Sequence, residues 1–249
     1  MNCSCSGGVD SIGLLHFLHN YKEQLGFTLS CVHVDHMLRG EVSKEDMRFV
    51  AQLCQHYEIP FYGKSIDIPR LLQEEGGNSQ ALCRRERYQY FQKVMEEIGA
   101  TTIVTAHHAD DQVESMLMSL TKNSAIKGLA GIYPKRSFYS GKLIRPFLAV
   151  TKDEIRGYLQ KKQLSWREDS SNAKDDYTRN RFRHHVIPQL REENPNVASN
   201  FVRISDQIRE DDQYLMTLAE QRFSNIVLKI EENIYNLKIE ALKHLTLLC

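Results

Sequence analysis

The stretch Ser6-Gly7-Gly8-Val9-Asp10-Ser11 carries the clearest chemical signal in the sequence. Two adjacent glycines let the backbone bend sharply and approach a ligand that a Cβ atom would keep away. Apolar residues recur at Ile12, Leu15 and Leu18, which is helical spacing. A turn that opens a helix presents free N–H groups and the positive end of the helix dipole. We therefore predict a phosphate site over Ser6–Ser11, although no Gly-Lys-Ser/Thr follows to make a Walker A loop.

A second stretch, His107-His108-Ala109-Asp110-Asp111-Gln112-Val113-Glu114, concentrates titratable side chains where an expected strand ends and a helix begins. Asp111 and Glu114 are three residues apart, so they share one helical face. Capping of the helix explains one aspartate but not the whole group. Two carboxylates facing a triphosphate would suit Mg²⁺, and we assign Asp10 and Asp111 to it. One carboxylate could instead orient or deprotonate an attacking amine.

Two groups of arginines are candidate phosphate contacts. Arg84 and Arg87 lie one turn apart in an expected long helix, and the alternative for them is a solvated charged face. The segment 179–191 holds four arginines and no acidic residue, with Phe182 and two histidines between them. Arginine forks match phosphate, so this segment is a candidate RNA-backbone patch. The alternative is a basic helix face balanced by the acidic pair at 192–193.

Alternating strands and helices must position these groups. We expect strands at 1–5, 27–35, 59–66 and 103–106, with helices at 11–24, 43–57, 67–75, 79–98 and 110–122. Ser43, with Asp46 three residues on, is the expected cap of the second helix. The pattern predicts an α/β fold, a Rossmann-like parallel sheet with helices on both faces. Ligands in such sheets bind at the carboxyl ends of the strands, where the candidate residues fall.

The rest of the chain is expected to be mainly helical. We predict a loop at 127–132, an extended segment at 143–148 and a helix at 152–162 that Thr151 caps. Helix continues from 190 to about 223, and a hairpin follows at 226–238 around Glu231-Glu232-Asn233. The expected organisation is a catalytic domain over 1–190 and a smaller helical, substrate-binding region over 191–249.

Composition narrows the class of protein. The 249 residues include 32 Lys+Arg and 32 Asp+Glu, so a nucleic-acid partner must be met by a local basic patch. The 6 cysteines form no C-x-x-C pair, which argues against a zinc ribbon, a redox dithiol or a cysteine-bound cluster. No apolar run is long enough for a membrane helix and no signal-peptide profile is present. We expect a cytoplasmic protein with no membrane partner.

Together these residues resemble the bacterial tRNA(Ile)-lysidine synthetase family, N-type ATP pyrophosphatases with an SGGxDS loop. The resemblance covers roughly residues 1 to 190, in the family's order. The matching segments are Ser6–Ser11, Val34–Gly40, Arg84–Tyr88, Ala106–Glu114, Gly128–Gly131, Arg145-Pro146, Asp169–Asn172 and Thr178–Arg183. It implies that ATP adenylates O2 of the wobble cytidine in tRNA(Ile) with a CAU anticodon. Free L-lysine then attacks C2, expelling AMP and forming lysidine, which changes codon reading from AUG to AUA.

The resemblance also implies roles for the candidate residues. The loop residues 6–11 bind the ATP phosphates, with Asp10 near Mg²⁺. Asp111 and Glu114 serve the metal and the lysine amine, and Arg87 contacts phosphate or cytidine. The tRNA-binding surface comprises Arg179, Asn180, Arg181 and Arg183, with Asn180 ordering that turn. The oligomeric state stays open, with a homodimer as one candidate.

Three departures from the family pattern affect these expectations. The first strand is short and polar, so we expect either a weak strand or, as we favour, a natural chain that begins before Met1. Ser115 stands where the family commonly has threonine. The sequence stops at Cys249, in an expected helix and short of the further domain that longer members use to grip the tRNA acceptor end.

Other functions remain open at this point. A cytidine thiolase is the nearest alternative, although the scattered cysteines do not favour it. A synthetase that adenylates a small molecule would leave the segment 179–183 unused. From other classes, a metal-dependent phosphohydrolase could use His107 to Asp111, and a nucleotide-binding module would use the loop without catalysis.

Overall fold

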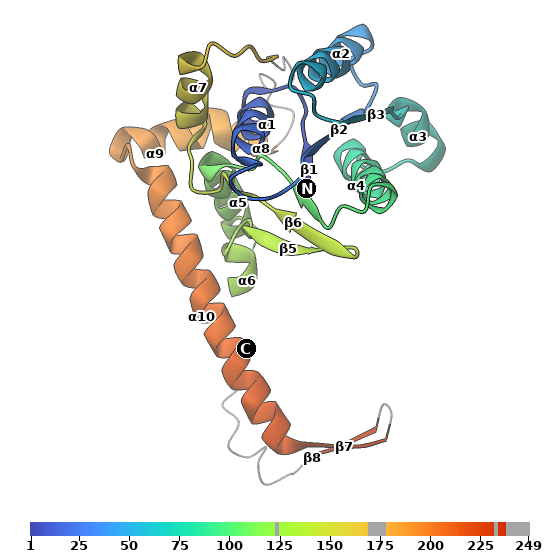
Figure 1. Ribbon diagram of the computed structural model, residues 1–249. Helices are drawn as coiled ribbons and strands as arrows, with labels where there is room; N and C mark the ends of the chain where they lie inside the picture. Colours follow the sequence, from blue (N-terminus) through green and yellow to red (C-terminus); the bar gives the residue numbers. More distant parts are fainter. Residues whose placement is uncertain (123–124, 169–177, 232–233, 238–249) are drawn as a thin grey trace.

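A six-stranded sheet with the order β3-β2-β1-β4-β6-β5 forms the centre of the molecule (Figure 1). The computed structural model describes residues 1–122, 125–168, 178–231 and 234–237, with side chains as far as residue 223. The strands are β1 (Asn2–Ser4), β2 (Ser30–Asp35), β3 (Phe61–Ser65), β4 (Thr102–Val104), β5 (Lys135–Phe138) and β6 (Gly141–Ile144). All neighbours pair in parallel except β5 and β6. The predicted α/β fold with a Rossmann-like parallel sheet is confirmed, and the antiparallel pair of β5 and β6 lies at one edge of that sheet.

The antiparallel edge arises from a tight hairpin that the sequence pattern did not reveal. Tyr139 adopts φ 46° between β5 and β6, the left-handed conformation that such a turn needs. β5 reads Lys-Arg-Ser-Phe, and only Phe138 of it is buried, so it lacks the apolar run of a central strand.

Helices cover both faces of the sheet. The α-helices are α1 (Val9–Tyr21), α2 (Glu41–His56), α3 (Ile68–Glu75), α4 (Ser79–Glu97), α5 (Ala109–Leu120), α6 (Ile126–Leu129), α7 (Lys152–Lys161), α8 (Thr178–Arg181), α9 (Ile187–Glu193) and α10 (Val197–Ile226). α1, α2 and α7 share one core cluster with β1, and α4 packs against the opposite face. At Gly13, a Cβ atom would lie 2.7 Å from Ile155 Cγ2, so only glycine lets α1 approach α7 this closely.

Two central strands bring distant parts of the chain together. β1 pairs with β2 on one side and with β4 on the other. The chain runs outward from β1 through β2 to β3 and then returns to the other side of β1 as β4. The order of the strands therefore reverses between β1 and β4, which is where open α/β sheets bind ligands. The loop after β1 and the histidines after β4 meet at this point.

The polar-looking first strand is buried. Asn2 and Cys3 are fully buried, and Cys5 just beyond the strand is almost so. A free thiol packs as a small hydrophobic group, so the two cysteines serve as core residues. The Asn2 side-chain oxygen accepts a hydrogen bond from Ser30 Oγ at 3.3 Å. The strand is short, as predicted, but it occupies a central place in the sheet.

Two local predictions are wrong. α2 begins at Glu41 with Gly40 as its N-cap, and Ser43 lies inside the helix, where its hydroxyl donates to the Gly40 carbonyl oxygen. Asp46 instead pairs with Arg39, so neither residue caps the helix as predicted. The predicted loop at 127–132 instead begins with a helical turn, because the short helix α6 extends to Leu129.

The C-terminal elements agree with the sequence pattern. Thr151 caps α7 through a capping box with Glu154, as predicted. α9 and α10 are helical, and a two-stranded hairpin of β7 (Val227–Glu231) and β8 (Ile234–Leu237) follows. α10 runs past α5 and α6 and projects away from the sheet (Figure 1). None of the helices in the described ranges has the length and apolar character needed to cross a membrane.

Three expectations fall outside the described residues. These are the Asp169–Asn172 motif, the Glu232-Asn233 turn and the helix expected around Cys249.

Candidate active site

The Ser11 hydroxyl fixes the shape of the glycine-rich loop through hydrogen bonds to its backbone. Its hydroxyl oxygen accepts hydrogen bonds from the N–H groups of Ser6 and Gly7, at 3.1 and 3.2 Å, and donates to the Gly8 carbonyl at 3.0 Å. α1 then begins at Val9 with no side-chain cap, so the loop ends on the open N-terminus of a helix. Such an N-terminus attracts anions through its N–H groups and its dipole. The local geometry fits the predicted phosphate site.

A second contact fixes the direction of the Gly7 peptide. Gly7 adopts φ 93°, and its carbonyl oxygen accepts a hydrogen bond from the Arg167 N–H at 2.9 Å. The Arg167 side chain donates to Asp46 and Glu45 on α2, each at 2.9 Å. This support was not predicted, because no sequence motif links residue 167 to the loop.

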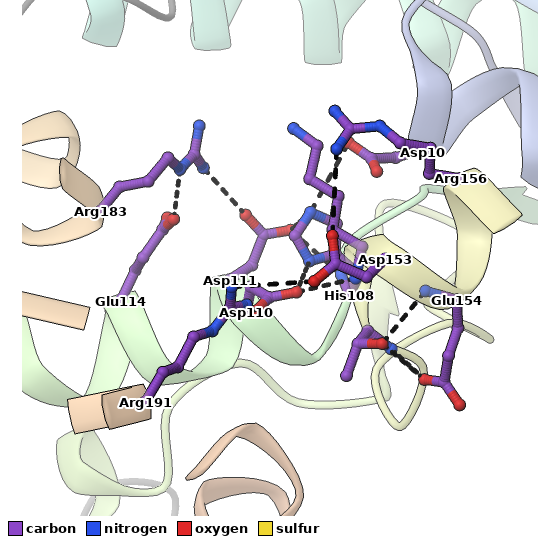
Figure 2. A network of polar contacts seen from close by, with 12 residues as sticks. Asp10, His108, Asp110, Asp111, Glu114, Asp153, Glu154, Arg156, Arg183 and Arg191 are labelled. Atoms are coloured by element: carbon purple, nitrogen blue, oxygen red, sulfur yellow. Dashed lines mark hydrogen bonds and ion pairs between the residues drawn. The ribbon is translucent and has the colours of Figure 1, made fainter. Parts of the chain in front are cut away.

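His108 lies among three aspartates (Figure 2). Its ring nitrogens are 3.6 Å from Asp10 Oδ2, 3.4 Å from Asp110 Oδ2 and 3.6 Å from Asp111 Oδ2. Burial opposes a charge on the ring, but the close contacts with the aspartates and their charges prevail and raise the pKa of His108 to about 10. The ring is therefore an imidazolium at neutral pH, and it holds Asp10 of the loop beside Asp111 of α5.

Asp110 faces away from the loop and joins three helices. It accepts a hydrogen bond from the Lys152 N–H at 2.8 Å, at the start of α7. It also pairs with Arg191 on α9. Burial opposes its charge, but the ion pair with His108 and the hydrogen bond from Lys152 hold the pKa of this carboxyl well below its usual range. Asp110 therefore has a structural role.

Glu114 is enclosed by two of the arginines predicted to bind tRNA. Arg179 Nε lies 2.9 Å from Glu114 Oε2, and Arg183 Nε donates to Glu114 Oε1 at 2.6 Å. Glu114 is fully buried, and burial raises the pKa of its carboxyl against the opposing effect of Arg183. Arg183 also lies 3.7 Å from Asp111 (Figure 2). These arginines therefore face the site, and Glu114 positions them.

Two adjoining cavities open over the strand ends. The smaller, about 240 Å³, is lined by Ser6, Gly8, Asp10 and Ser11 of the loop together with Arg87 and Asp111. The larger, about 890 Å³, extends over the end of β2 and along α4. Arg87 and Arg179 border both cavities. A nucleotide with its phosphates on the loop could therefore extend into a space large enough for a second substrate.

Two histidines at these cavities are neutral. His107 lines the smaller cavity, and burial, helped by nearby arginines against Asp111, lowers its pKa to about 4. His36 lines the larger cavity, and burial together with the Arg87 charge lowers its pKa to about 4. Neutral imidazoles can accept hydrogen bonds at neutral pH, but a pKa of about 4 makes both rings weak bases.

The structure separates the remaining predicted residues. Val9 points into the hydrophobic core, so only its backbone belongs to the loop. Asn180 is buried and lines the larger cavity. Arg181 is exposed and donates to Thr178 Oγ1 at 3.0 Å. A π-helix over Phe182–Val186 follows, a form that often occurs at functional sites.

Asp10 and Asp111 fit a role in holding Mg²⁺. Asp10 Oδ1 is buried and makes no hydrogen bond, and both carboxylates line the smaller cavity. Among the described residues, no group of three or more His, Cys, Asp and Glu side chains forms a complete metal site. Mg²⁺ usually keeps several waters and binds one or two carboxylates plus substrate phosphates, so two aspartates are sufficient.

Comparison with known proteins agrees with this geometry. A family model described as a PP-loop domain matches residues 1–190. The chain is 45% identical over 222 residues to the tRNA(Ile)-lysidine synthase of Bacillus subtilis, covering 89% of this chain and 47% of that protein. For the same enzyme of Geobacillus kaustophilus the values are 44% over 224 residues, 90% and 48%. The chain thus spans about half the length of the curated relatives it matches.

A solved structure supports the fold independently. The U34-tRNA thiolase NcsA from Methanococcus maripaludis, with its [4Fe-4S] cluster, superposes with a TM-score of 0.66 at 16% sequence identity, covering 84% of this chain and 71% of that chain. At this identity the likeness concerns the fold alone. The residues that match the PP-loop model include the loop, both cavities and the His108 cluster. The chain therefore belongs to the PP-loop family, and its relatives include tRNA(Ile)-lysidine synthases.

Proposed function

We propose that this chain catalyses the ATP-dependent joining of free L-lysine to C2 of the wobble cytidine of tRNA(Ile) with a CAU anticodon. One observation carries the proposal. The glycine-rich loop, Asp10 and Asp111 line a cavity of about 240 Å³ that adjoins one of about 890 Å³, in a chain 45% identical to a lysidine synthase. The loop accounts for ATP, and the cavity has room for the base and the amino acid.

The first step is adenylation of the base. O2 of the cytidine attacks the α-phosphorus of ATP, and pyrophosphate leaves with the electrons of the broken P–O bond. The N–H groups at the start of α1 stabilise the charge that grows on the leaving group. Asp10 and Asp111 would hold Mg²⁺, which supplies positive charge against the pyrophosphate when it is bound. Arg87 and Arg179 border both cavities and are suited to the phosphate that stays on the base.

The second step is attack of the lysine ε-amine on C2. The C2–O2 bond breaks, AMP leaves, and the nitrogen loses a proton. The amine must first be neutral, and its unperturbed pKa is about 10.4. His107 is neutral and lines the smaller cavity, so we assign it to accept a hydrogen bond from the amine, and the released proton passes to water. Glu114 is already paired with two arginines, and we assign it to positioning Arg179 and Arg183.

Incorporation of radiolabelled lysine into tRNA tests the proposal. With ATP and Mg²⁺, we expect the wild type to label tRNA(Ile) with a CAU anticodon and Asp111→Asn to lose about 100-fold or more of that rate, as for other charged groups that stabilise a transition state. Asp153→Asn is the matched control, because Asp153 is 72% exposed on α7 and should retain the rate.

Two results would contradict the proposal. Pyrophosphate release that depends on another nucleophile would retain the loop chemistry and exclude lysine. Phosphate release without tRNA, dependent on a transition metal, would favour a phosphohydrolase.

A further inference from the structure

Tyr88 on α4 lies at the centre of four arginines, Arg84, Arg87, Arg136 and Arg145, which we call the Tyr88 arginine cluster. The guanidinium carbons of Arg84, Arg136 and Arg87 lie 4.8, 5.5 and 5.9 Å from the centre of the Tyr88 ring. Arg145 follows β6 directly, close enough to Tyr88, Arg84 and Arg136 for these groups to influence its pKa. The cluster joins α4 to the β5–β6 hairpin.

No carboxylate neutralises this cluster within the described part of the chain. Arg136 and Arg145 donate their hydrogen bonds to backbone carbonyls, those of Ser137 and Tyr133 respectively. Burial lowers the pKa of Arg145, and the charges of Arg136 and Arg84 lower it further. Cations this close repel one another, so an anion bound among them would offset a cost that the folded chain otherwise bears.

Arg85, the neighbour of Arg84 on α4, is by contrast paired with carboxylates. Arg85 forks onto Glu75, with its two terminal nitrogens 2.7 and 2.9 Å from the two carboxylate oxygens, and also contacts Glu86. The chain therefore has carboxylates within reach of this part of α4, but they serve Arg85. The Tyr88 arginine cluster is left with charge that points to an external ligand.

The cluster stands at the edge of the proposed reaction site. Arg87 and Tyr88 line the smaller cavity, and Arg84 lines the larger. Arg136 lines neither and lies on the hairpin outside them. Segment 135–145 contains four basic residues and no acidic one. A positive surface therefore continues from the cavities over the hairpin.

Arg145 is the buried member of the cluster. It is 6% exposed, and its Nε is buried without a hydrogen-bond partner. Buried guanidinium donors are almost always satisfied, so an unsatisfied one marks a place where a ligand or a water completes the bonds. Forked guanidinium groups match the oxygens of a phosphate, and an aromatic ring beside them suits an unstacked base.

We propose that the Tyr88 arginine cluster binds a phosphodiester of the RNA strand next to the base that enters the cavity. This inference rests on the proposed function, since it takes the RNA as the substrate. The phosphates of ATP have the loop at residues 6–11, whereas Arg84 lines only the larger cavity and Arg136 lines neither. Single-stranded loops are the usual targets in RNA recognition, and their phosphates are accessible from the side.

Salt-dependent binding of tRNA to Arg84→Gln and Arg136→Gln tests the site. Both side chains reach solvent, so we expect the variants to fold, as thermal unfolding will check. Filter binding of tRNA(Ile) with a CAU anticodon at several salt concentrations gives the slope of log K against log salt. Loss of one phosphate contact on a single strand should reduce that slope by about 0.7. Arg136→Lys should restore it, because the charge is kept.

Two controls separate the possible sources of the anion. Arg85→Gln removes a charge from the same helix and should leave the slope unchanged, because Arg85 is already paired. Affinity for a non-hydrolysable ATP analogue should stay within about twofold of the wild type in both test variants.

An unchanged slope in both test variants would overturn the inference. Weaker ATP-analogue binding with unchanged tRNA binding would overturn it too, because the anion would then be a phosphate of ATP. Lysine incorporation by the wild type is measured separately. If it is absent while the slopes still differ, the proposed function fails and the phosphate site stands.

Discussion

The molecule contains two groups of arginines with opposite surroundings. Those after residue 178 meet carboxylates: Arg179 and Arg183 pair with Glu114, and Arg191 pairs with Asp110. Those around Tyr88 meet one another, the rings of Tyr88 and Phe138, and backbone carbonyls in the described structure. The first group looked more like an RNA-binding patch in the sequence, because its segment lacks acids. The second has more unneutralised charge, so pairing in space, and not spacing in the sequence, decides which arginines can attract a phosphate.

Breaking the paired group should have the largest effect. Glu114→Gln leaves Arg179 and Arg183 facing each other without their common carboxylate. Removing one partner of a buried ion pair costs about 3–5 kcal/mol, and we expect the lower end because the arginines are 39% and 27% exposed. Urea unfolding measures the loss. Glu74→Gln breaks an exposed pair with Arg70 and should cost under about 1 kcal/mol; equal losses would contradict the contrast.

Raising the pH should destabilise the region of the paired arginines, where His108 loses its charge, but not the Tyr88 arginine cluster. The pKa of His108 is about 10 in the folded chain, against 6.5 as the reference value. Its stabilising contribution is therefore complete below about pH 6.5 and is lost as the pH rises through 10. Each pKa unit corresponds to about 1.4 kcal/mol. Urea unfolding from pH 6.5 to 10 should show the wild type losing stability faster than His108→Gln, and parallel curves would argue against the imidazolium.

Removing Arg181 should have the smallest effect. Arg181 is the exposed member of the 179–183 segment, and we expect Arg181→Ala to weaken tRNA binding slightly and to flatten its salt dependence by at most about 0.7 unit of slope, the value for one phosphate contact on a single strand. The unfolding free energy should change by less than about 0.5 kcal/mol, as is usual for surface substitutions. Filter binding beside the Tyr88 cluster variants gives the comparison. An unchanged slope would show that Arg181 does not contact a phosphate, and would leave the Tyr88 arginine cluster as the proposed contact of the RNA strand.

Much of the site was predictable because its signals are local. Two glycines between serines predict a sharp turn, and the helical spacing of Ile12, Leu15 and Leu18 predicts the helix after that turn. The histidines after residue 106 were likewise predicted at a strand end. The Arg167 contact was not predictable, since a backbone hydrogen bond to Gly7 leaves no trace in side-chain type. The β5–β6 hairpin was missed because only Phe138 of β5 is buried, so its pattern lacks an apolar run.

The polar first strand is an instructive case between these extremes. Its composition argued for a weak strand or a late start of the sequence, yet it pairs on both sides in the centre of the sheet. The cysteines pack as apolar groups there, and Asn2 finds a partner in Ser30. Hydrophobicity read from residue types alone therefore undervalued this segment.

The sequence by itself determined the class of fold, the glycine-rich loop and the acidic stretch after the fourth strand, because each depends on periodicity or on neighbours within a few residues. Only the tertiary structure decided which of these groups meet. The return of the chain to the other side of β1 sets Asp10 beside Asp111 across His108. The same packing pairs one group of arginines with carboxylates. In the described structure it leaves the Tyr88 arginine cluster without such partners, so its positive charges repel one another. Electrostatic energy depends on distance in space, which the order of residues does not record.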